Sequence, residues 1–120
     1  MGDVLTYVGE EWVVDKLVAG GNVYVGWGTG GDTADKGDTA LSTEAAESRS
    51  QITPTKTGSG TSAKYSAIGT ITCAGSGKTI TNSGILSQSS GGSLYIFSTF
   101  TGIALNVGDS IQFTFTLDPV

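Results

Sequence analysis

Hydrophobic and polar residues follow two different periods along this chain of 120 residues. In residues 4–18, Val4, Val8 and Trp12 recur every four positions, which is the spacing of one face of an α-helix. Gly20-Gly21 follows, as is usual just past a helix C-terminus. A helix of three to four turns is marginal alone, so we expect this apolar stripe to pack on a sheet.

From residue 22 onward the period changes to two, which predicts β-strands. The last strand is the clearest, because Ile111, Phe113, Phe115 and Leu117 alternate strictly with polar residues. The expected strands are 22–27, 47–57, 63–73, 78–87 (broken near 82–84), 93–101 and 109–118. Pro54 confines the second of these strands to a sheet edge or a bulge.

Short strands separated by Gly-rich turns predict an all-β fold, namely an antiparallel β-sandwich or a jelly-roll-like barrel with one short N-terminal helix. We expect a single domain, with a helix or arm at 1–21 and the sandwich at 22–120. The loop at 28–38 is rich in Gly and Asp, and we expect it to be the most mobile segment, either a contact arm or a disordered loop.

The composition excludes several kinds of catalytic and metal-binding site. The chain has no His and a single cysteine, Cys73, which excludes Ser-His-Asp catalysis, cysteine-cluster zinc sites and an intrachain disulfide. We expect Cys73 to be a small buried hydrophobe. No pair of carboxylates has a recognisable orienting partner, so we predict that the protein is not an enzyme and needs no cofactor.

Charge is unevenly distributed. Residues 1–47 hold nine acidic and two basic residues, whereas residues 48–120 hold two acidic and four basic ones, giving the net −5. Nucleic acid and membrane are therefore not expected partners, since there is neither a basic stripe nor an apolar run long enough to span a bilayer. The 30 residues from Thr79 to Gly108 carry no charge, which fits buried strands or a surface facing another subunit.

Two glycine-rich motifs resemble nucleotide-binding sites but lack the flanking sequence that such sites need. Residues 26–31 match G-x-G-x-x-G, but the Asp-rich sequence that follows does not open a helix. Residues 75–79 resemble the end of a P-loop, but position 72 is Thr and a strand follows. We interpret the first motif as a strand exit and the second as a hairpin turn with Lys78 on its rim.

Two binding sites remain as alternatives. The acidic residues Asp32, Asp35 and Asp38, with Glu44 nearby, are either a solvated acidic loop or oxygen ligands for a hard cation such as Ca²⁺. The two tryptophans, Trp12 and Trp27, are either core or interface anchors or stacking platforms for a sugar.

Several short segments occur in a distinctive order along the chain. Val25-Gly26-Trp27-Gly28-Thr29-Gly30 leads through the Asp-rich loop to 38–44 and then to Arg49. The later segments of this pattern are 69–72, 78–86, 91–95 and 100–115. In this order the chain resembles, over residues 22–117, a family of small virion structural proteins of tailed bacteriophages, described as capsid decoration (cement) or tail-fibre-like proteins.

This resemblance implies a capsid decoration protein on the outer surface of the virion head, made in the cytoplasm of the bacterial host. Its implied partners are the major capsid protein and further copies of itself, commonly as a trimer. The alternatives are a tail-fibre or baseplate component with a receptor-binding surface, or a carbohydrate-binding module. The residues expected to make capsid or subunit contacts are Trp12, Trp27, Asp32, Asp35, Asp38, Glu44, Arg49, Phe97 and Phe100.

Overall fold

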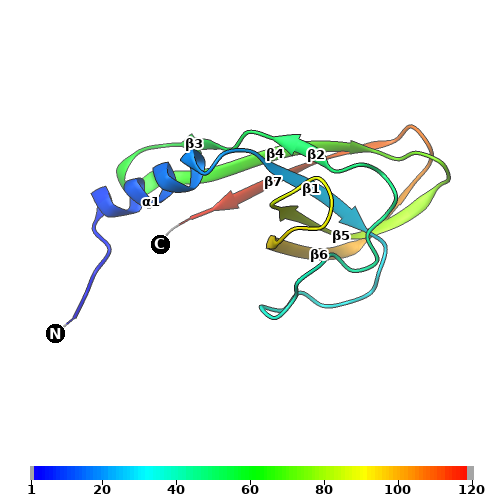
Figure 1. The fold of residues 1–120 in the computed structure, drawn as a ribbon, viewed down its shortest axis with the longest axis horizontal. Coiled ribbons are helices and arrows are strands. Elements are labelled where there is room, and N and C mark those ends of the chain that lie inside the picture. The colour runs from blue at the N-terminus through cyan, green and yellow to red at the C-terminus, as the bar shows by residue number, and fades with distance from the viewer. Residues whose placement is uncertain (1, 119–120) are drawn as a thin grey trace.

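The computed structural model, which describes residues 2–118, contains two antiparallel sheets packed face to face, with one helix at an end (Figure 1). This confirms the predicted β-sandwich with a short N-terminal helix. Its elements are α1 (Tyr7–Ala19), β1 (Val23–Gly28), β2 (Ser50–Ile52), β3 (Thr55–Thr57), a 3-10 turn (Gly60–Ser62), β4 (Lys64–Thr72), β5 (Lys78–Leu86), β6 (Leu94–Leu105) and β7 (Ser110–Leu117).

The strands form two separate open sheets. The strand order is β2-β1-β5-β6 in the first, here sheet A, and β3-β4-β7 in the second, sheet B. All the strand pairs are antiparallel. Because each sheet ends in unpaired edges, the fold is an open sandwich and not a closed barrel.

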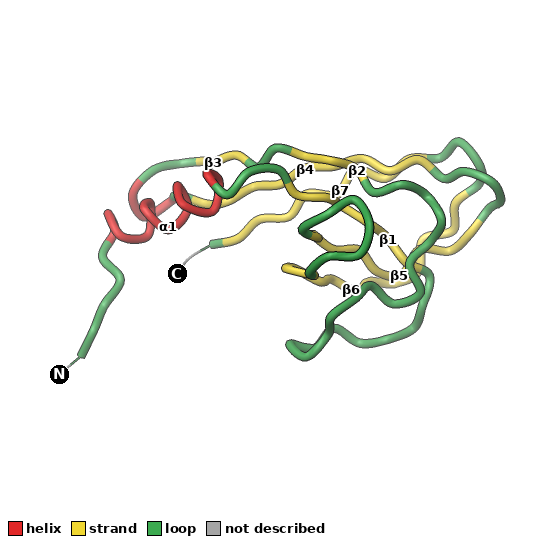
Figure 2. The backbone as a smooth tube through the Cα atoms, viewed as in Figure 1, coloured by secondary structure: helices red, strands yellow, loops and turns green. Residues whose placement is uncertain are grey.

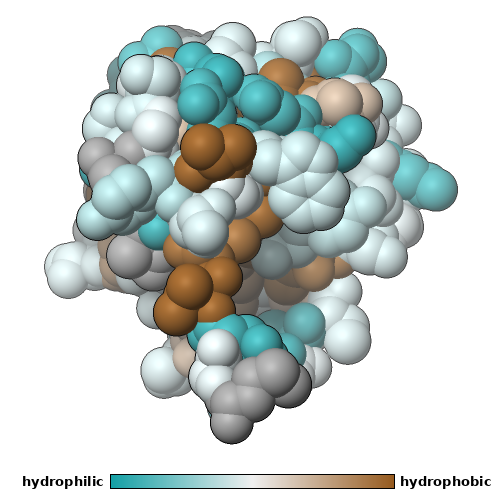
Figure 3. Space-filling model, turned by 90° about the vertical axis from the view of Figure 1, so that its left-hand side faces the viewer, coloured by the Kyte–Doolittle hydropathy of each residue, from teal (hydrophilic) through white to brown (hydrophobic). Residues whose placement is uncertain are grey.

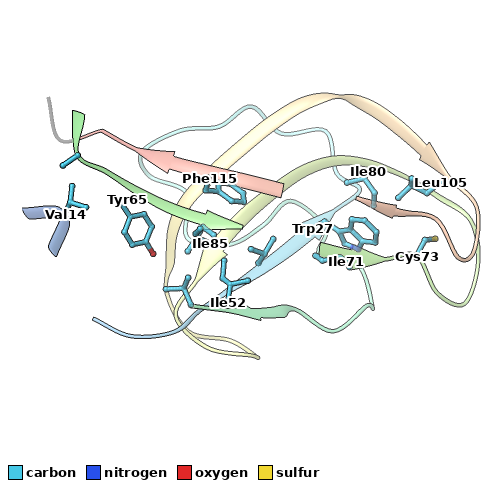
Figure 4. Close-up of a cluster of buried hydrophobic side chains, with 14 residues drawn as sticks. Val14, Trp27, Ile52, Tyr65, Ile71, Cys73, Ile80, Ile85, Leu105 and Phe115 are labelled. Atoms are coloured by element: carbon cyan, nitrogen blue, oxygen red, sulfur yellow. The ribbon is translucent and has the colours of Figure 1, made fainter. Parts of the chain in front are cut away.

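The core lies between the two sheets (Figure 4). Trp27 of β1 is 1% exposed and meets the ring of Phe113 on β7 edge-on, with 6.2 Å between the ring centroids. Phe113 also stacks on Phe115, at 6.4 Å. Cys73 is buried at one end of this core, as expected. Aromatic side chains from both sheets therefore bridge the layers.

The helix lies close to the predicted segment, beginning at Tyr7 and not at residue 4, but it packs through a different face. The Thr6 side chain caps α1 by accepting a hydrogen bond from the Gly9 amide, at 3.1 Å. Val14 is fully buried, whereas Val8 and Trp12 are 80% and 58% exposed. The expectation that the stripe through Val4, Val8 and Trp12 packs on the sheet is therefore wrong.

Charge pairs to another element support this orientation. Lys56 on β3 lies 2.7 Å from a carboxylate oxygen of Glu11 and 3.0 Å from one of Asp15. Glu11 also accepts a hydrogen bond from the Gly60 amide, at 3.4 Å. These contacts hold the helix with the Val14 side inward, and the stripe of Val8 and Trp12 stays in solvent.

Two strands differ from expectation. The predicted strand at 47–57 is two three-residue strands, β2 and β3, that lie in different sheets. Buried Pro54 stands between them, where the chain crosses from one layer to the other. By contrast, β5 is continuous through 82–84, and the predicted break is instead a register irregularity against β6 between Ile80 and Asn82.

The molecule is elongated, with extents of 54 × 26 × 24 Å. The helix lies at one end of the long axis, and the tube in Figure 2 shows long loops on one side of the sandwich. The longest, between β1 and β2, spans residues 29–49.

Candidate partner-binding surfaces

Backbone hydrogen bonds attach the 29–49 loop to the sandwich through residues on both sides of its tip. Gly30 donates its amide hydrogen to the Ser42 carbonyl, and Thr29 donates to the Thr43 carbonyl, each at 3.0 Å. Ala45 in turn donates to the carbonyl of Trp27, also at 3.0 Å. These bonds extend the β1 edge as a short hairpin and leave residues 31–40 as an exposed tip.

A buried amide on β5 holds the same loop from beneath. Asn82, which is fully buried, accepts from the Ser42 amide at 3.2 Å and donates to the Ser42 carbonyl at 3.0 Å. Thr81 donates its hydroxyl hydrogen to the Gly30 carbonyl. The base of the loop, at residues 29–30 and 42–45, is therefore a fixed part of sheet A, whereas most of the segment predicted to be mobile, residues 31–38, lies beyond these contacts.

A glycine pair makes room for the loop's apolar anchor. Gly26 on β1 and Gly84 on β5 are cross-strand partners, and Leu41 lies over both. A Cβ at either position would come within 2.9 Å of a Leu41 methyl group. Leu41 is 7% exposed, so this contact seals the outer face of sheet A beneath the loop.

Glu47 ties the far end of the loop to three other parts of the chain. Its carboxylate accepts hydrogen bonds from the Trp27 indole and the Ala74 amide, both at 3.0 Å, and from the Lys78 ammonium group. Burial raises the pKa of Glu47, but these donors outweigh burial and lower the pKa to about 2. Lys78, predicted on an exposed hairpin rim, is instead mostly buried at the start of β5 by this ion pair.

Arg49 clamps the loop to the β5–β6 turn. Its guanidinium group donates to both carboxylate oxygens of Glu44, each at 2.7 Å, and to the carbonyls of Gln88 and Gly91, at 2.7 and 2.8 Å. The hydrogen bond to Glu44 raises the pKa of Arg49. Because the Arg49 side chain is only 7% exposed, its charge serves the fold.

The exposed loop tip carries the acidic residues singled out from the sequence. Asp35 accepts from the Gly37 amide and Asp38 accepts from the Asp35 amide, both at 2.7 Å, while Asp32 accepts from the Ser42 hydroxyl at 3.0 Å. Within residues 2–118, no three His, Cys, Asp or Glu side chains are grouped so that they could hold a metal ion. The tip is therefore a turn ordered by its own carboxylates.

A cleft of about 520 Å³ separates the loop tip from β6. Asp35, Lys36 and Asp38 line one wall, and Tyr95 and Phe97 line the other. Tyr95 is 62% exposed, so this hollow presents an aromatic surface beside acidic groups.

The helix end exposes a second surface. Val4, Leu5, Val8 and Trp12 are all exposed. Figure 3 looks at this end and shows a run of apolar side chains above the N-terminal segment. We call these four residues the N-terminal apolar stripe.

The predicted contact residues thus fall into three groups. Trp27 lies in the core and Arg49 is nearly buried by Glu44 and the β5–β6 turn, so neither offers an external contact, which corrects that expectation. Phe100 is half-buried and packs near Phe113, with 6.3 Å between the ring centroids. The residues that reach the surface are Trp12 in the apolar stripe, Asp32, Asp35 and Asp38 at the loop tip, Glu44, which remains accessible although it binds Arg49, and Phe97 in the cleft beside the tip.

The residues that organise these surfaces were missed by sequence reasoning. Asn82 lies in a strand where Asn is unfavourable, and that mismatch was read as a strand break. Glu47 gives no local signal, because its partners are 20 to 31 residues away in the chain.

No helix in the part of the chain described here is long and apolar enough to cross a membrane. Comparison with protein-family models, with curated proteins and with solved structures finds no match for this chain.

Proposed function

We propose that this protein is a structural component of a tailed-phage virion, a capsid decoration protein that binds the major capsid protein on the outer surface of the head. The observation that carries the proposal is that the N-terminal segment and the 29–49 loop project from the same side of the sandwich (Figure 1). Two projections on one side fit attachment to a broad surface, such as a capsid lattice.

The two projections offer different chemistry. The loop tip presents Asp32, Asp35 and Asp38, which suit a basic patch on the partner. The N-terminal apolar stripe supplies exposed aliphatic and aromatic side chains. Because Asn82 and the hairpin bonds already order the loop, less conformational entropy is lost when it binds.

Two ion pairs that join segments of the fold support a structural role. Each pair joins two segments of the fold: Glu47 binds Lys78, and Glu44 binds Arg49. Decoration needs a stable domain and a contact surface, and many repeated weak contacts on a lattice add up to firm attachment.

Binding to purified virions tests the proposal. Asp35→Asn keeps an oxygen that accepts the Gly37 amide hydrogen but removes one charge from the loop tip. At low ionic strength we expect it to weaken binding about three- to tenfold. Asp109→Asn is the matched control, because Asp109 also accepts a turn amide hydrogen, from Asn106 at 2.8 Å, but lies outside both projections.

The apolar projection is tested with Val8→Asp, which changes an 80% exposed side chain. We expect it to weaken attachment while leaving the fold intact. If Asp35→Asn and Val8→Asp both bind virions as the wild type does, the two-projection attachment is wrong.

The cleft between the loop tip and β6 favours a second candidate, a tail-fibre or baseplate component that binds a receptor. Exposed Tyr95 beside Asp35 and Asp38 is a combination suited to stacking and hydrogen bonding with a sugar. Calorimetric titration with host cell-surface glycans distinguishes the candidates. Glycan binding that Tyr95→Ala removes would support the receptor-binding role.

A further inference from the structure

The two lateral sides of the sandwich differ in how well they are protected against pairing with a strand of another chain. On one side the edge strands β2 and β3 are only three residues long and are separated by Pro54. β3 also carries Lys56, which Glu11 and Asp15 of the helix hold. Short strands, a proline and a charged side chain are the devices by which proteins prevent edge-to-edge pairing.

The opposite side is formed by β6 and β7, and neither strand contains a charged residue or a proline. β6 is irregular, with register shifts against β5 near Leu94–Ile96 and near Thr99–Ile103, and such irregularities disrupt further pairing. β7 pairs with β4 in unbroken register from Ser110 to Leu117. Within residues 2–118, β4 is its only strand neighbour.

The inner side chains of β7 are incompletely covered. Ile111 and Phe113 are half-buried, although both pack against the core. Leu117 is 41% exposed and lines a cleft of about 410 Å³ between the sheets, together with Tyr65 and Ile96. The edge of β7 thus combines unpaired backbone groups with apolar side chains that remain partly in solvent.

We propose that β7 pairs antiparallel with β7 of a second copy of this chain, joining two B sheets into one six-stranded sheet about a two-fold axis. Pairing odd-numbered residues opposite odd-numbered ones places both sandwiches on the same face of the joined sheet, whereas a slip of one residue would place them on opposite faces; we propose the first arrangement. The axis then passes through Phe113 or Thr114. Such a contact is isologous, with the same strand used by both copies.

Charge selects a second copy as the occupant. Each chain carries −5, and residues 1–47 hold most of the acidic groups, so contact between two copies costs least where the surface carries no charge. The β7 strand is uncharged, and at its end Lys64 lies 3.9 Å from Asp118. An uncharged edge whose backbone is self-complementary is where two such acidic chains can meet.

The available area fits a reversible dimer. Eight strand residues extend about 26 Å, and the molecule is 24–26 Å across its shorter axes. The seam therefore covers at most about 600 Å² per copy, below the roughly 800 Å² of a standard specific interface. We expect association that depends on concentration.

Sedimentation equilibrium of the full chain tests the inference. The wild type should approach twice the chain mass of 12.2 kDa as concentration rises. Thr114→Lys places like charges opposite or diagonal to each other across the seam, and should weaken the dimer at least tenfold. Thr70→Lys is the matched control, since Thr70 is also exposed on the outer face of sheet B but lies on the central strand β4.

Circular dichroism and the fluorescence of buried Trp27 check that each variant is folded, and Gln112→Lys serves as a second edge variant should Thr114→Lys fail to fold. A wild type that stays monomeric at all concentrations would overturn the inference, as would a dimer that resists both edge variants. A trimer, which the family resemblance implies, would also overturn it, because isologous pairing of β7 gives two copies. Each result can be read without virions, so it is separate from the test of capsid attachment.

Discussion

Single charged residues in this protein act mainly as internal connectors. The Glu47 carboxylate joins β1, the 74–77 turn and the start of β5 through three donors. Its partner Lys78 is mostly buried, so the pair replaces hydration with fixed hydrogen bonds. We infer that Glu47 holds the far end of the 29–49 loop in place.

Glu47→Gln should lower the free energy of unfolding at neutral pH by about 2–3 kcal/mol, because the Lys78 charge loses its partner. The effect should depend on pH. The folded pKa of Glu47 is lowered to about 2, from an ordinary value of 4.5. Its contribution is therefore complete above about pH 4.5 and is lost as the pH falls toward 2.

Urea titrations of the wild type and Glu47→Gln between pH 7 and pH 2 measure this difference. The two unfolding free energies should converge as the solution becomes acidic. A constant gap over that whole range would show that Glu47 does not act through its charge.

Local residue roles were predictable from the sequence, and non-local ones were not. The burial of Cys73 follows from its residue type and the composition of the chain, and it is confirmed. Asn82 and Arg49 acquire their roles from backbone groups about 40 residues away in sequence. No local pattern specifies such partners before the strand pairing is known.

At the scale of elements, the helix shows why periodicity alone can mislead. The spacing of Val4, Val8 and Trp12 correctly predicts a helix. The buried face, however, is the one that carries Val14, and ion pairs from Glu11 and Asp15 to Lys56, a residue on another element, flank it. The apolar stripe is thereby left free for contacts outside the domain.

Two valine substitutions test the orientation of α1. Val14→Ala should lower the free energy of unfolding by about 2 kcal/mol, because it leaves a cavity against the sheet. Val8→Ala should change it by less than about 0.5 kcal/mol, because Val8 lies in solvent. Thermal denaturation of both variants measures the difference, and the reverse order would mean that the helix packs through its apolar stripe.

The strands were easier to predict than their pairing. Alternation and Gly-rich turns place most strands within a few residues, as in β4 and β7. The division at Pro54 into strands of two sheets was not predicted, because it depends on where each layer lies. The slot that Gly26 and Gly84 make for Leu41 likewise requires the register of β1 against β5.

The close approach of Leu41 to Gly26 leads to a quantitative prediction. Gly26→Ala should destabilise the fold by about 1–3 kcal/mol through overpacking against Leu41, and Leu41→Ala by about 2–3 kcal/mol through lost burial. The double variant should lose less stability than the sum of the two single losses, by at least about 0.5 kcal/mol. The reason is that removing the Leu41 side chain leaves room for the methyl group added at position 26. Chemical denaturation of all four proteins completes the cycle, and strict additivity would mean that the two residues do not meet.

At the scale of the whole molecule, the sandwich architecture was predictable because composition, alternation and turn spacing agree. The surface was less predictable. Of the expected contact residues, Trp27 and Arg49 are internal, whereas the acidic tip is exposed. In the resulting molecule the acidic loop and the N-terminal segment project on one side (Figure 1), and the strand edge at β7 is uncharged.

The central claim is that this protein decorates a phage head, and the most direct measurement is its copy number and position on purified virions. The protein is added to virions, the bound fraction is sedimented and quantified against the major capsid protein, and the particles are imaged. We predict a copy number comparable with that of the major capsid protein, with density distributed over the head. A few copies confined to the tail, or no binding at all, would contradict the account.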